Sequence, residues 1–210
     1  MNLLIMGAPG GGKGTQAEIL AKALSIPTIS TGAMLRNVIA LGTELGNQAK
    51  KYIDSGNLVP DGVITGIVID RLKEQDCKDG YILDGFPRTL KQAESLETAG
   101  IQIDNAIVLK VTDEEIINRV VGRRVCSKCG ATYHISYNPS KVEGVCDVCS
   151  AQLITRDDDN TKTVRHRLAT YHSQTEPVIN FYAKRDKLIV VEGIGSVEEI
   201  SQKLLSALGV

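Results

Sequence analysis

The sequence predicts an α/β protein built on a parallel sheet, and two observations support this. Apolar, β-prone runs alternate with helical patterns along most of the chain, and a glycine-rich loop separates the first run from the first helix. Such alternation favours a sheet covered by helices on both faces, which makes three layers, with ligands at the carboxyl ends of the strands. The five predicted strands cover residues 2–6, 27–29, 81–83, 105–111 and 188–191.

The glycine-rich loop, residues 7–15, has the composition of a phosphate-binding site. Glycines allow positive φ and let backbone N–H groups approach phosphate oxygens, a helix N-terminus adds a positive dipole end, and Lys13 adds a mobile charge. The general form of this loop has Ser or Thr directly after the lysine, whereas here Gly14 intervenes and the hydroxyl arrives at Thr15. The predicted phosphate-binding residues are Gly10, Gly11, Gly12, Lys13, Gly14 and Thr15.

The composition narrows the classes of protein to consider. The chain has 210 residues, enough for one domain with an insertion or for two modest lobes. Its 24 Lys and Arg nearly balance its 25 Asp and Glu, which argues against a large nucleic-acid footprint. The N-terminal apolar run lacks a basic flank, and no stretch approaches the ~20 apolar residues of a membrane span. We therefore expect a cytoplasmic protein with no membrane or nucleic-acid partner.

Two segments interrupt the alternation. Residues 31–72, the helical segment, are almost wholly helical in pattern. The predicted breaks between its helices are Gly42, Gly46 and Gly56. Residues 122–159, the cysteine segment, combine paired cysteines with β-prone residues and an acidic triplet, which suits a small metal-stapled insert. After it, residues 161–183 are predicted to form a long helix that kinks or breaks at Pro177.

The cysteine segment predicts a structural metal site. Cys126 and Cys129 form one Cys-x-x-Cys pair, Cys146 and Cys149 form another, and sixteen residues separate the pairs. This spacing is typical of four-cysteine zinc sites. Two disulfides are the alternative, and they fit a reducing compartment poorly; iron or cobalt could occupy the same ligands. His134 is nearby, but four thiolates already complete the set, so we expect it to be an ordinary surface residue.

A carboxylate ends the third apolar run. Asp84 follows residues 81–83, the usual arrangement for holding Mg²⁺ near phosphates, often through water. The residues after it are Gly85, Phe86, Pro87 and Arg88. Together with the opening loop, this string resembles the adenylate kinase family, and the resemblance covers essentially all 210 residues. The four-cysteine insert points to the bacterial long-lid form.

The resemblance implies a three-layer P-loop fold with three parts. The core would comprise residues 1–29, 60–121 and 160–210, the helical NMP-binding lobe residues 30–59, and the small β-rich zinc lid residues 122–159. It also implies a monomer that catalyses ATP + AMP = 2 ADP with Mg²⁺ and a structural Zn²⁺. The lobe and lid would close over both substrates to exclude water, with hinges near Gly122 and Asp159.

Site residues carry over from the resemblance position by position. Besides the loop, the ATP contacts would be Arg119, Arg123, Thr132, Tyr133 and Gly195. The AMP contacts would be Thr31, Arg36, Asn57, Leu58, Val59, Gly85, Phe86, Pro87, Arg88 and Gln92. The arginines that brace the phosphates on closure would be Arg156 and Arg167, joining Lys13, Arg88 and Arg123 as catalytic groups. Arg119, four residues before Arg123, is expected on the same helix face. Two departures from the family pattern are Asn57, often basic, and Gly11, commonly alanine.

Other assignments follow from the chemistry. Phosphoryl transfer between polyphosphates needs guanidinium groups and no general base, so we expect His166 and His172 to be solvated or capping residues. Arg71 and Arg185 are interpreted as surface ion pairs, and Cys77 as a small apolar residue. Arg124 and Arg165 remain undecided.

Three other functions compete with this one. The first is a related nucleoside monophosphate kinase that accepts UMP or CMP, or one that uses GTP as donor. The second is a zinc-ribbon NTPase that switches on nucleic acid, and the balanced charge argues against it. The third is a metal-binding module with an inactive nucleotide site, which the intact lysine and arginine set weakens.

Overall fold

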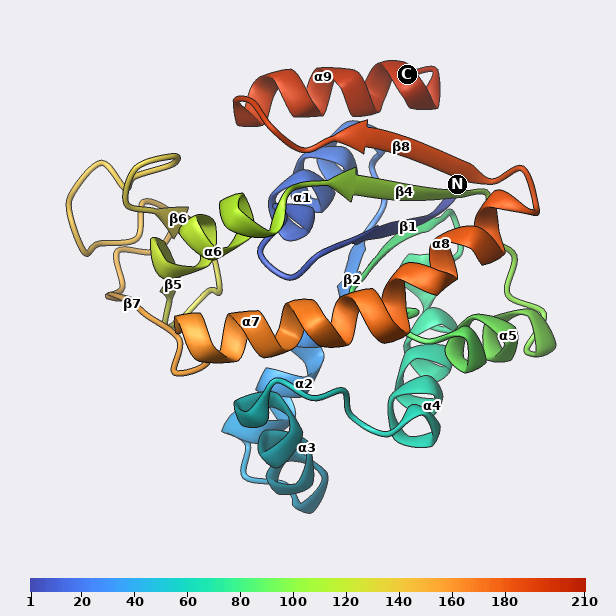
Figure 1. Ribbon diagram of the computed structural model, residues 1–210, viewed down its shortest axis with the longest axis horizontal. Helices are drawn as coiled ribbons and strands as arrows, with labels where there is room; N and C mark the ends of the chain where they lie inside the picture. The colour runs from blue at the N-terminus through green and yellow to red at the C-terminus, as the bar shows by residue number, and fades with distance from the viewer.

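The central element of the protein is a parallel sheet. The computed structural model describes residues 1–210, apart from the side chain of Leu45, and is drawn in Figure 1. Five strands pair in the order β2-β3-β1-β4-β8, all parallel. They are β1 (Asn2–Gly7), β2 (Thr28–Ser30), β3 (Tyr81–Asp84), β4 (Asn105–Lys110) and β8 (Leu188–Glu192). Their carboxyl ends share one edge, so the predicted fold class is confirmed.

Helices cover both faces of this sheet. The α-helices are α1 (Lys13–Leu24), α2 (Thr31–Ala40), α3 (Glu44–Ser55), α4 (Asp61–Leu72), α5 (Leu90–Thr98), α6 (Asp113–Val121), α7 (Thr161–Thr170), α8 (Glu176–Ala183) and α9 (Val197–Leu208). A 3₁₀ turn, η1 (Gln75–Cys77), and a π-helical turn, η2 (Tyr171–Thr175), complete the set. In Figure 1, α1 and α9 lie on one side of the sheet, and α5 and α8 lie on the other. None of the helices among the described residues is both long enough and apolar enough to cross a membrane.

Strand β1 shows why the sequence folds in three layers. Leu3 and Ile5 point into an apolar cluster with residues of α1 and α9. Leu4 and Met6 point into the opposite cluster with residues of α5 and α8. Successive side chains of a strand alternate between faces, so a continuously apolar strand needs cover on both. Each fully buried side chain of this size contributes about 1.5–3 kcal/mol.

The cysteine segment forms a second, separate sheet. Strands β5 (Arg123–Cys126), β6 (Thr132–His134) and β7 (Leu153–Ile154) pair in antiparallel order β6-β5-β7. Its apolar cluster contains Cys126, Tyr133, Cys146 and Leu153. The segment thus has a small core of its own, as expected for a β-rich insert.

The helical segment is confirmed, with one correction at Gly46. This glycine was expected to break a helix, yet it lies within the first turn of α3. The side chain of Thr43 caps that helix by accepting from the Gly46 N–H at 3.0 Å. A Cβ at Gly46 would meet the carbonyl oxygen of Val38 in α2. The glycine is therefore present because the α2 and α3 backbones pack closely.

The substitution Gly46→Ala is expected to destabilise the protein. Its new methyl group would push against a backbone carbonyl, and such overpacking costs about 1–3 kcal/mol. Gly66→Ala is the matched control, because a Cβ there meets nothing within 4 Å and should stabilise α4 by about 0.5–1 kcal/mol. Urea unfolding of both variants measures the difference. Equal stabilities would contradict the close packing of α2 on α3.

The helix over residues 161–183 departs from regularity at a different place from the one predicted. Pro177 was expected to break it, but the π-helical turn η2 comes first, at Tyr171–Thr175. Pro177 lies in the first turn of α8, directly after η2, where it has no N–H with which to continue the helical hydrogen bonds. The helix is irregular near the proline, as predicted, but the irregularity is a π-helical turn before Pro177 and not a break at Pro177 itself.

Candidate active site

One large cavity opens at the carboxyl edge of the main sheet. It has a volume of about 570 Å³ and is lined by the glycine-rich loop, the helical segment, the cysteine segment and α7. Two acidic residues, Glu18 and Asp84, reach its lining. The basic residues that line it are Lys13, Arg36, Arg88, Arg119, Arg123, Arg156 and Arg167. This excess of positive charge suits a strongly anionic ligand.

The glycine-rich loop presents a free helix end to this cavity. Gly12 precedes α1 with φ of 86°, and no side chain caps the helix there. By contrast, α5, α6, α7 and α9 are each capped by a side chain. Gly10 also has positive φ, 85°, and a Cβ on it would collide with Val120. The first N–H groups of α1 are thus available to phosphate oxygens.

Lys13 is held at the floor of the loop. Its Nζ donates to the carbonyl oxygens of Gly7 at 2.9 Å and Ala8 at 2.8 Å. Desolvation lowers the pKa of Lys13 to about 8, although the nearby Asp84 acts in the opposite direction. The positive charge of Lys13 is therefore only partly balanced by its surroundings in this structure, and a bound phosphate would supply the missing negative charge.

Binding of ATP above pH 8 is expected to take up a proton. The cationic form of Lys13 is the form that binds phosphate, so affinity should be constant below pH 8 and fall as the pH rises through that value. At pH 8.5, calorimetry of MgATP binding without AMP, in two buffers of different ionisation enthalpy, measures the uptake. The uptake should disappear in Lys13→Met. Identical heats in the two buffers for the unsubstituted protein would contradict the lowered pKa.

Asp84 lies at the end of β3, beside the glycine-rich loop. Its Oδ2 accepts from the Ser30 hydroxyl at 3.3 Å, and a Cβ on Gly14 would lie 3.8 Å from the same oxygen. A carboxylate with neighbouring hydroxyls, next to a phosphate loop, fits the oxygen ligands that Mg²⁺ prefers. The prediction for Asp84 therefore has a consistent geometry.

Arg88 is fixed through its main chain. Its N–H donates to Gln92 Oε1 at 2.7 Å, its carbonyl accepts from the Thr175 hydroxyl at 2.9 Å, and its Nε donates to Gly85 O at 2.7 Å. The guanidinium group faces the cavity, and desolvation by the surrounding protein lowers its pKa. The anchoring role of Thr175 could not be read from the sequence, because it depends on the turn η2.

The residues expected around AMP fall into two groups. Arg36, Asn57, Leu58 and the residues 85–88 line the cavity. Thr31, Val59 and Gln92 are buried behind its wall. There the Thr31 hydroxyl donates to Gly85 O at 2.9 Å, and Gln92 Nε2 donates to Asp61 Oδ1 at 2.6 Å. The second group holds the wall in place in this structure. Asn57 also meets α7, where its Oδ1 lies 2.9 Å from His166 Nε2.

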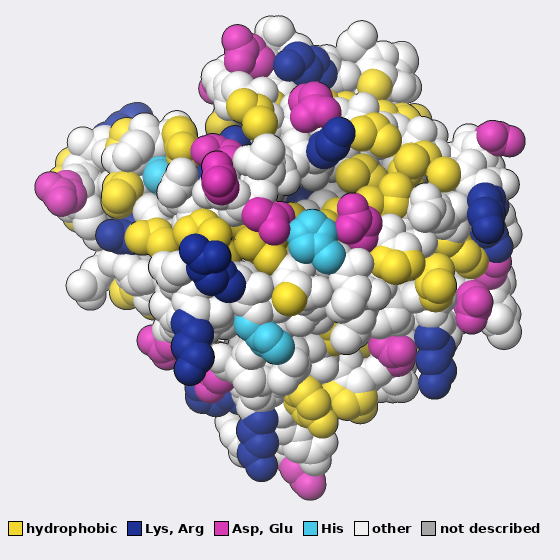
Figure 2. All heavy atoms as spheres, in the orientation of Figure 1, with side chains coloured by type: hydrophobic (Ala, Val, Ile, Leu, Met, Phe, Trp, Pro, Cys, Tyr) yellow, Lys and Arg dark blue, Asp and Glu magenta, His cyan; other side chains and the backbone are white. Residues whose placement is uncertain are grey.

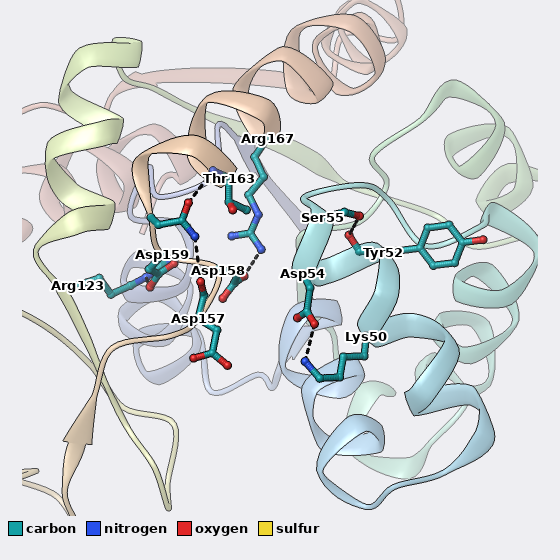
Figure 3. A network of polar contacts seen from close by, with 11 residues as sticks. Lys50, Tyr52, Asp54, Ser55, Arg123, Asp157, Asp158, Asp159, Thr163 and Arg167 are labelled. Carbon is teal, nitrogen blue, oxygen red and sulfur yellow. Dashed lines mark hydrogen bonds and ion pairs between the residues drawn. The ribbon is translucent and has the colours of Figure 1, made fainter.

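Two aspartates of the cysteine segment pair with site arginines, as Figure 3 shows. Arg123 donates twice to Asp159, and Arg167 donates to Asp158. Burial pushes the pKa of Asp158 upward, but the charge and hydrogen bond of Arg167 outweigh it and leave the pKa below its usual value. Sequence reasoning noted the acidic triplet only as composition. The position of this triplet directly after Arg156 was the sequence feature that could have indicated ion pairs with the site arginines.

The expected helix face shared by Arg119 and Arg123 is wrong. Helix α6 ends at Val121, and Arg123 lies in β5. Arg119 pairs with Glu115 at 2.7 Å and stands 5.7 Å from the centre of the Tyr137 ring. Both arginines still line the cavity, because the chain turns at Gly122 into the second sheet. Arg156 lies there too, and desolvation together with Arg36 and Arg123 lowers its pKa to about 10.

The four cysteines of the pairs come together in space. The Sγ atoms of Cys126, Cys129, Cys146 and Cys149 all lie within 4.8 Å of one another. A tetrahedral zinc with bonds of about 2.3 Å needs sulfurs about 3.8 Å apart, so the cluster fits the metal. The shortest separations, 3.4 and 3.6 Å, are far longer than a disulfide bond of about 2.05 Å. His134 lies outside the cluster.

Comparison of the sequence with known proteins points to a single family. A family model described as "Adenylate kinase" matches residues 5–187. The adenylate kinases of Ruminiclostridium cellulolyticum and Lachnospira eligens are 52% and 50% identical to the chain, each over 100% of both sequences. That of Acetivibrio thermocellus is 52% identical over 99% of the chain and 98% of the relative. The chain belongs to the adenylate kinase family.

Membership of the adenylate kinase family makes the chain a nucleoside monophosphate kinase, a phosphotransferase. Most residues predicted from the family resemblance line one cavity, and Thr31, Val59 and Gln92 lie buried behind its wall. Other assignments agree with the structure. Arg71 pairs with Asp76 at 2.6 Å and Arg185 with Glu97 at 2.6 Å, away from the cavity, and Cys77 is buried. Arg124 and Arg165 are absent from the described lining of the cavity.

His172 is also accounted for in this adenylate kinase. It is half exposed and lies between Glu176, 2.9 Å away, and Asp113, 3.1 Å away. The hydrogen bond with Glu176 and that with Asp113 raise its pKa. The histidine joins α6 to the turn η2 and is not among the residues that line the cavity, which agrees with the expectation of a partly solvated residue outside the site.

Proposed function

We propose that the chain catalyses ATP + AMP = 2 ADP with Mg²⁺ and so balances adenine nucleotides. The observation that carries this proposal is the convergence of seven basic side chains on one cavity that also contains the phosphate loop. A single polyphosphate would not require so many cations from separate parts of the chain. Two nucleotides bound with their phosphates facing each other would require this many cations.

The ATP half of the proposed site is built on α1 and the cysteine segment. The glycine-rich loop and Lys13 hold the phosphates, and Arg119 and Arg123 stand beside them. The remaining ATP contacts are Thr132, Tyr133 and Gly195, all in the lining of the same cavity. The AMP half is built on the helical segment and residues 85–88, with Arg36 and Arg88 toward its phosphate. Thr31 and Gln92 hold the wall on the AMP side through hydrogen bonds to Gly85 and Asp61. The family resemblance makes these two residues the candidates for selecting adenine.

The transfer needs no general base. A nonbridging oxygen of the AMP phosphate, ionised because its pKa is about 6, attacks the γ-phosphorus of ATP. A new P–O bond forms, and the bond from that phosphorus to the β–γ bridging oxygen breaks, so ADP leaves with the electron pair. Charge spreads over the equatorial oxygens of the transferred group. Lys13, Arg88, Arg123, Arg156 and Arg167 stabilise it, because guanidinium forks and an ammonium group match those oxygens.

Two metals complete the proposal. Mg²⁺ bound with ATP would be held by Asp84 through water, and it would neutralise charge on the phosphates. Zn²⁺ would be held by the four clustered thiolates; a closed set of this kind leaves no position for catalytic water, so its contribution is structural.

The proposed division of the chain follows from this. Residues 1–29, 60–121 and 160–210 form the core, 30–59 the NMP-binding lobe and 122–159 a zinc lid. The lobe and lid close over both nucleotides, which keeps water from accepting the phosphoryl group. The separate sheet and apolar cluster of the cysteine segment support its movement as one body.

We propose that the protein acts as a cytoplasmic monomer on free nucleotides. On the face drawn in Figure 2, basic and acidic side chains are interspersed and do not form a field of one sign. This mixture supports small-molecule partners over nucleic acid or a membrane surface, both of which favour extended basic patches.

A coupled assay tests the function. MgATP is offered with AMP, UMP, CMP and GMP in turn, and GTP replaces ATP in a parallel series. We expect kcat/KM for AMP to exceed that for the other acceptors by about 100-fold or more, because a site that hydrogen-bonds one base leaves its polar groups unpaired with another. A preference for UMP or CMP would replace the proposal with a related kinase. Phosphate release without an acceptor would replace it with an NTPase.

A further inference from the structure

Tyr133 spans the distance between the nucleotide cavity and the cysteine cluster. The residue lies in β6, lines the cavity and is only 8% exposed. Its hydroxyl lies among the cysteines, 3.5 Å from Cys146 Sγ. The same oxygen accepts a hydrogen bond from the Asp147 N–H at 2.8 Å.

The hydrogen bond from Asp147 bears on the direction of the contact with Cys146. The Asp147 N–H can only donate, so the tyrosine oxygen is the acceptor of that bond and its own proton remains free for Cys146. A metal-bound cysteine is a thiolate, which can only accept. The arrangement is therefore N–H to oxygen, then O–H to sulfur.

We propose that the Tyr133 hydroxyl donates a hydrogen bond to the metal-bound thiolate of Cys146 and thereby links metal retention to the ATP side of the lid. Tyr133 is then a positioning residue for the metal as well as a wall of the nucleotide cavity. This inference rests on the zinc site proposed above and adds a residue to it. Loss of partners that bond to metal ligands typically lowers metal affinity by 10–100-fold.

The link has a reciprocal consequence. Because one residue reaches both sites, a metal that fixes Cys146 also fixes Tyr133 at the cavity. If metal strengthens ATP binding, ATP strengthens metal binding by the same factor, since coupling between two sites is mutual. AMP lies on the other side of the cavity and should produce a smaller effect.

The experiment compares the full-length zinc-loaded protein with Tyr133→Phe and Tyr137→Phe. Tyr137 is the matched control, because it is a second lid tyrosine at the cavity whose hydroxyl donates to Glu115 at 3.3 Å instead of to a cysteine. Zinc transfer to a chromogenic chelator is measured with and without MgATP. We expect about 10-fold weaker zinc retention in Tyr133→Phe, a loss of the protection given by MgATP, and unchanged values in Tyr137→Phe.

Cobalt substitution supplies a readout that a general loss of stability would not change. Removing a hydrogen bond from a thiolate changes its electron donation, so the sulfur-to-cobalt charge-transfer band should shift in Tyr133→Phe only. Wild-type zinc retention and an unshifted band in Tyr133→Phe would overturn the inference, as would equal losses in both variants. Absence of one tightly bound zinc per chain in the unsubstituted protein would instead overturn the zinc site itself.

Discussion

Lys13→Met is expected to reduce kcat/KM by about 10³-fold or more while leaving the fold intact. Removal of one donor that stabilises transition-state charge costs about 10²–10³ in rate, and Lys13 adds a full charge next to the transferred group in the proposed site. Its ammonium now contacts two carbonyls of the glycine-rich loop and is close to Asp84, Arg88 and Arg123. Methionine has similar length and no charge, so the cavity should keep its shape.

Lys22→Met is the matched control for this prediction. Lys22 lies in the last turn of the same helix and does not reach the described lining of the cavity. It should keep normal turnover, and the melting temperatures of both variants should match that of the unsubstituted protein. A Lys13→Met enzyme with near-normal rates would remove Lys13 from the catalytic group and leave its role purely structural.

Loss of the zinc proposed for the cysteine segment is expected to have the largest effect on stability. Cys126→Ser removes a buried sulfur that accepts from the Lys128 and Cys129 N–H groups, both at 3.4 Å, and leaves three thiolates. Structural zinc contributes on the order of 10 kcal/mol to small domains that it staples. The lid cluster has four buried members, too few to replace it. We expect residues 123–154 to lose protection from hydrogen exchange first, well below the melting temperature of the sheet.

Cys77→Ala separates this effect from the loss of any buried sulfur. Cys77 is buried outside the cluster, and its truncation should cost about 1 kcal/mol and leave metal content unchanged. Metal analysis, calorimetric melting and hydrogen exchange together measure the prediction. If residues 123–154 keep their protection from hydrogen exchange in a metal-free Cys126→Ser protein, metal binding by the thiolates does not stabilise this segment.

The main sheet and the glycine-rich loop could be predicted because their signals are local. The apolar strand and the lysine of the loop both lie within the first 13 residues, and sterics alone restrict what such a short string can do. The cysteine spacing correctly predicted that the four cysteines meet in space for the same reason, because two short Cys-x-x-Cys turns need few other contacts to bring their sulfurs together. Local chemistry therefore predicted the phosphate loop and the cysteine cluster, whereas the arginines and the AMP contacts came from the family resemblance.

The errors and omissions arose where distant residues decide local structure. Gly46 fits inside α3 because Val38 lies against it, and no neighbour in sequence reports that contact. The turn η2 places Thr175 on the Arg88 carbonyl across 87 residues. The change from α6 to β5 separated Arg119 from Arg123, although helical spacing had joined them. In each case tertiary packing overrode a periodic pattern.

The separate apolar cluster of the lid has a consequence for how such an enzyme can adapt. The lid cluster shares no member with the three clusters of the rest of the chain among the described residues. Substitutions that strengthen or loosen it leave the packing beneath the phosphate loop untouched. A lineage that moves to a hotter or colder habitat can therefore change the packing of the cysteine segment separately from the packing of the main sheet.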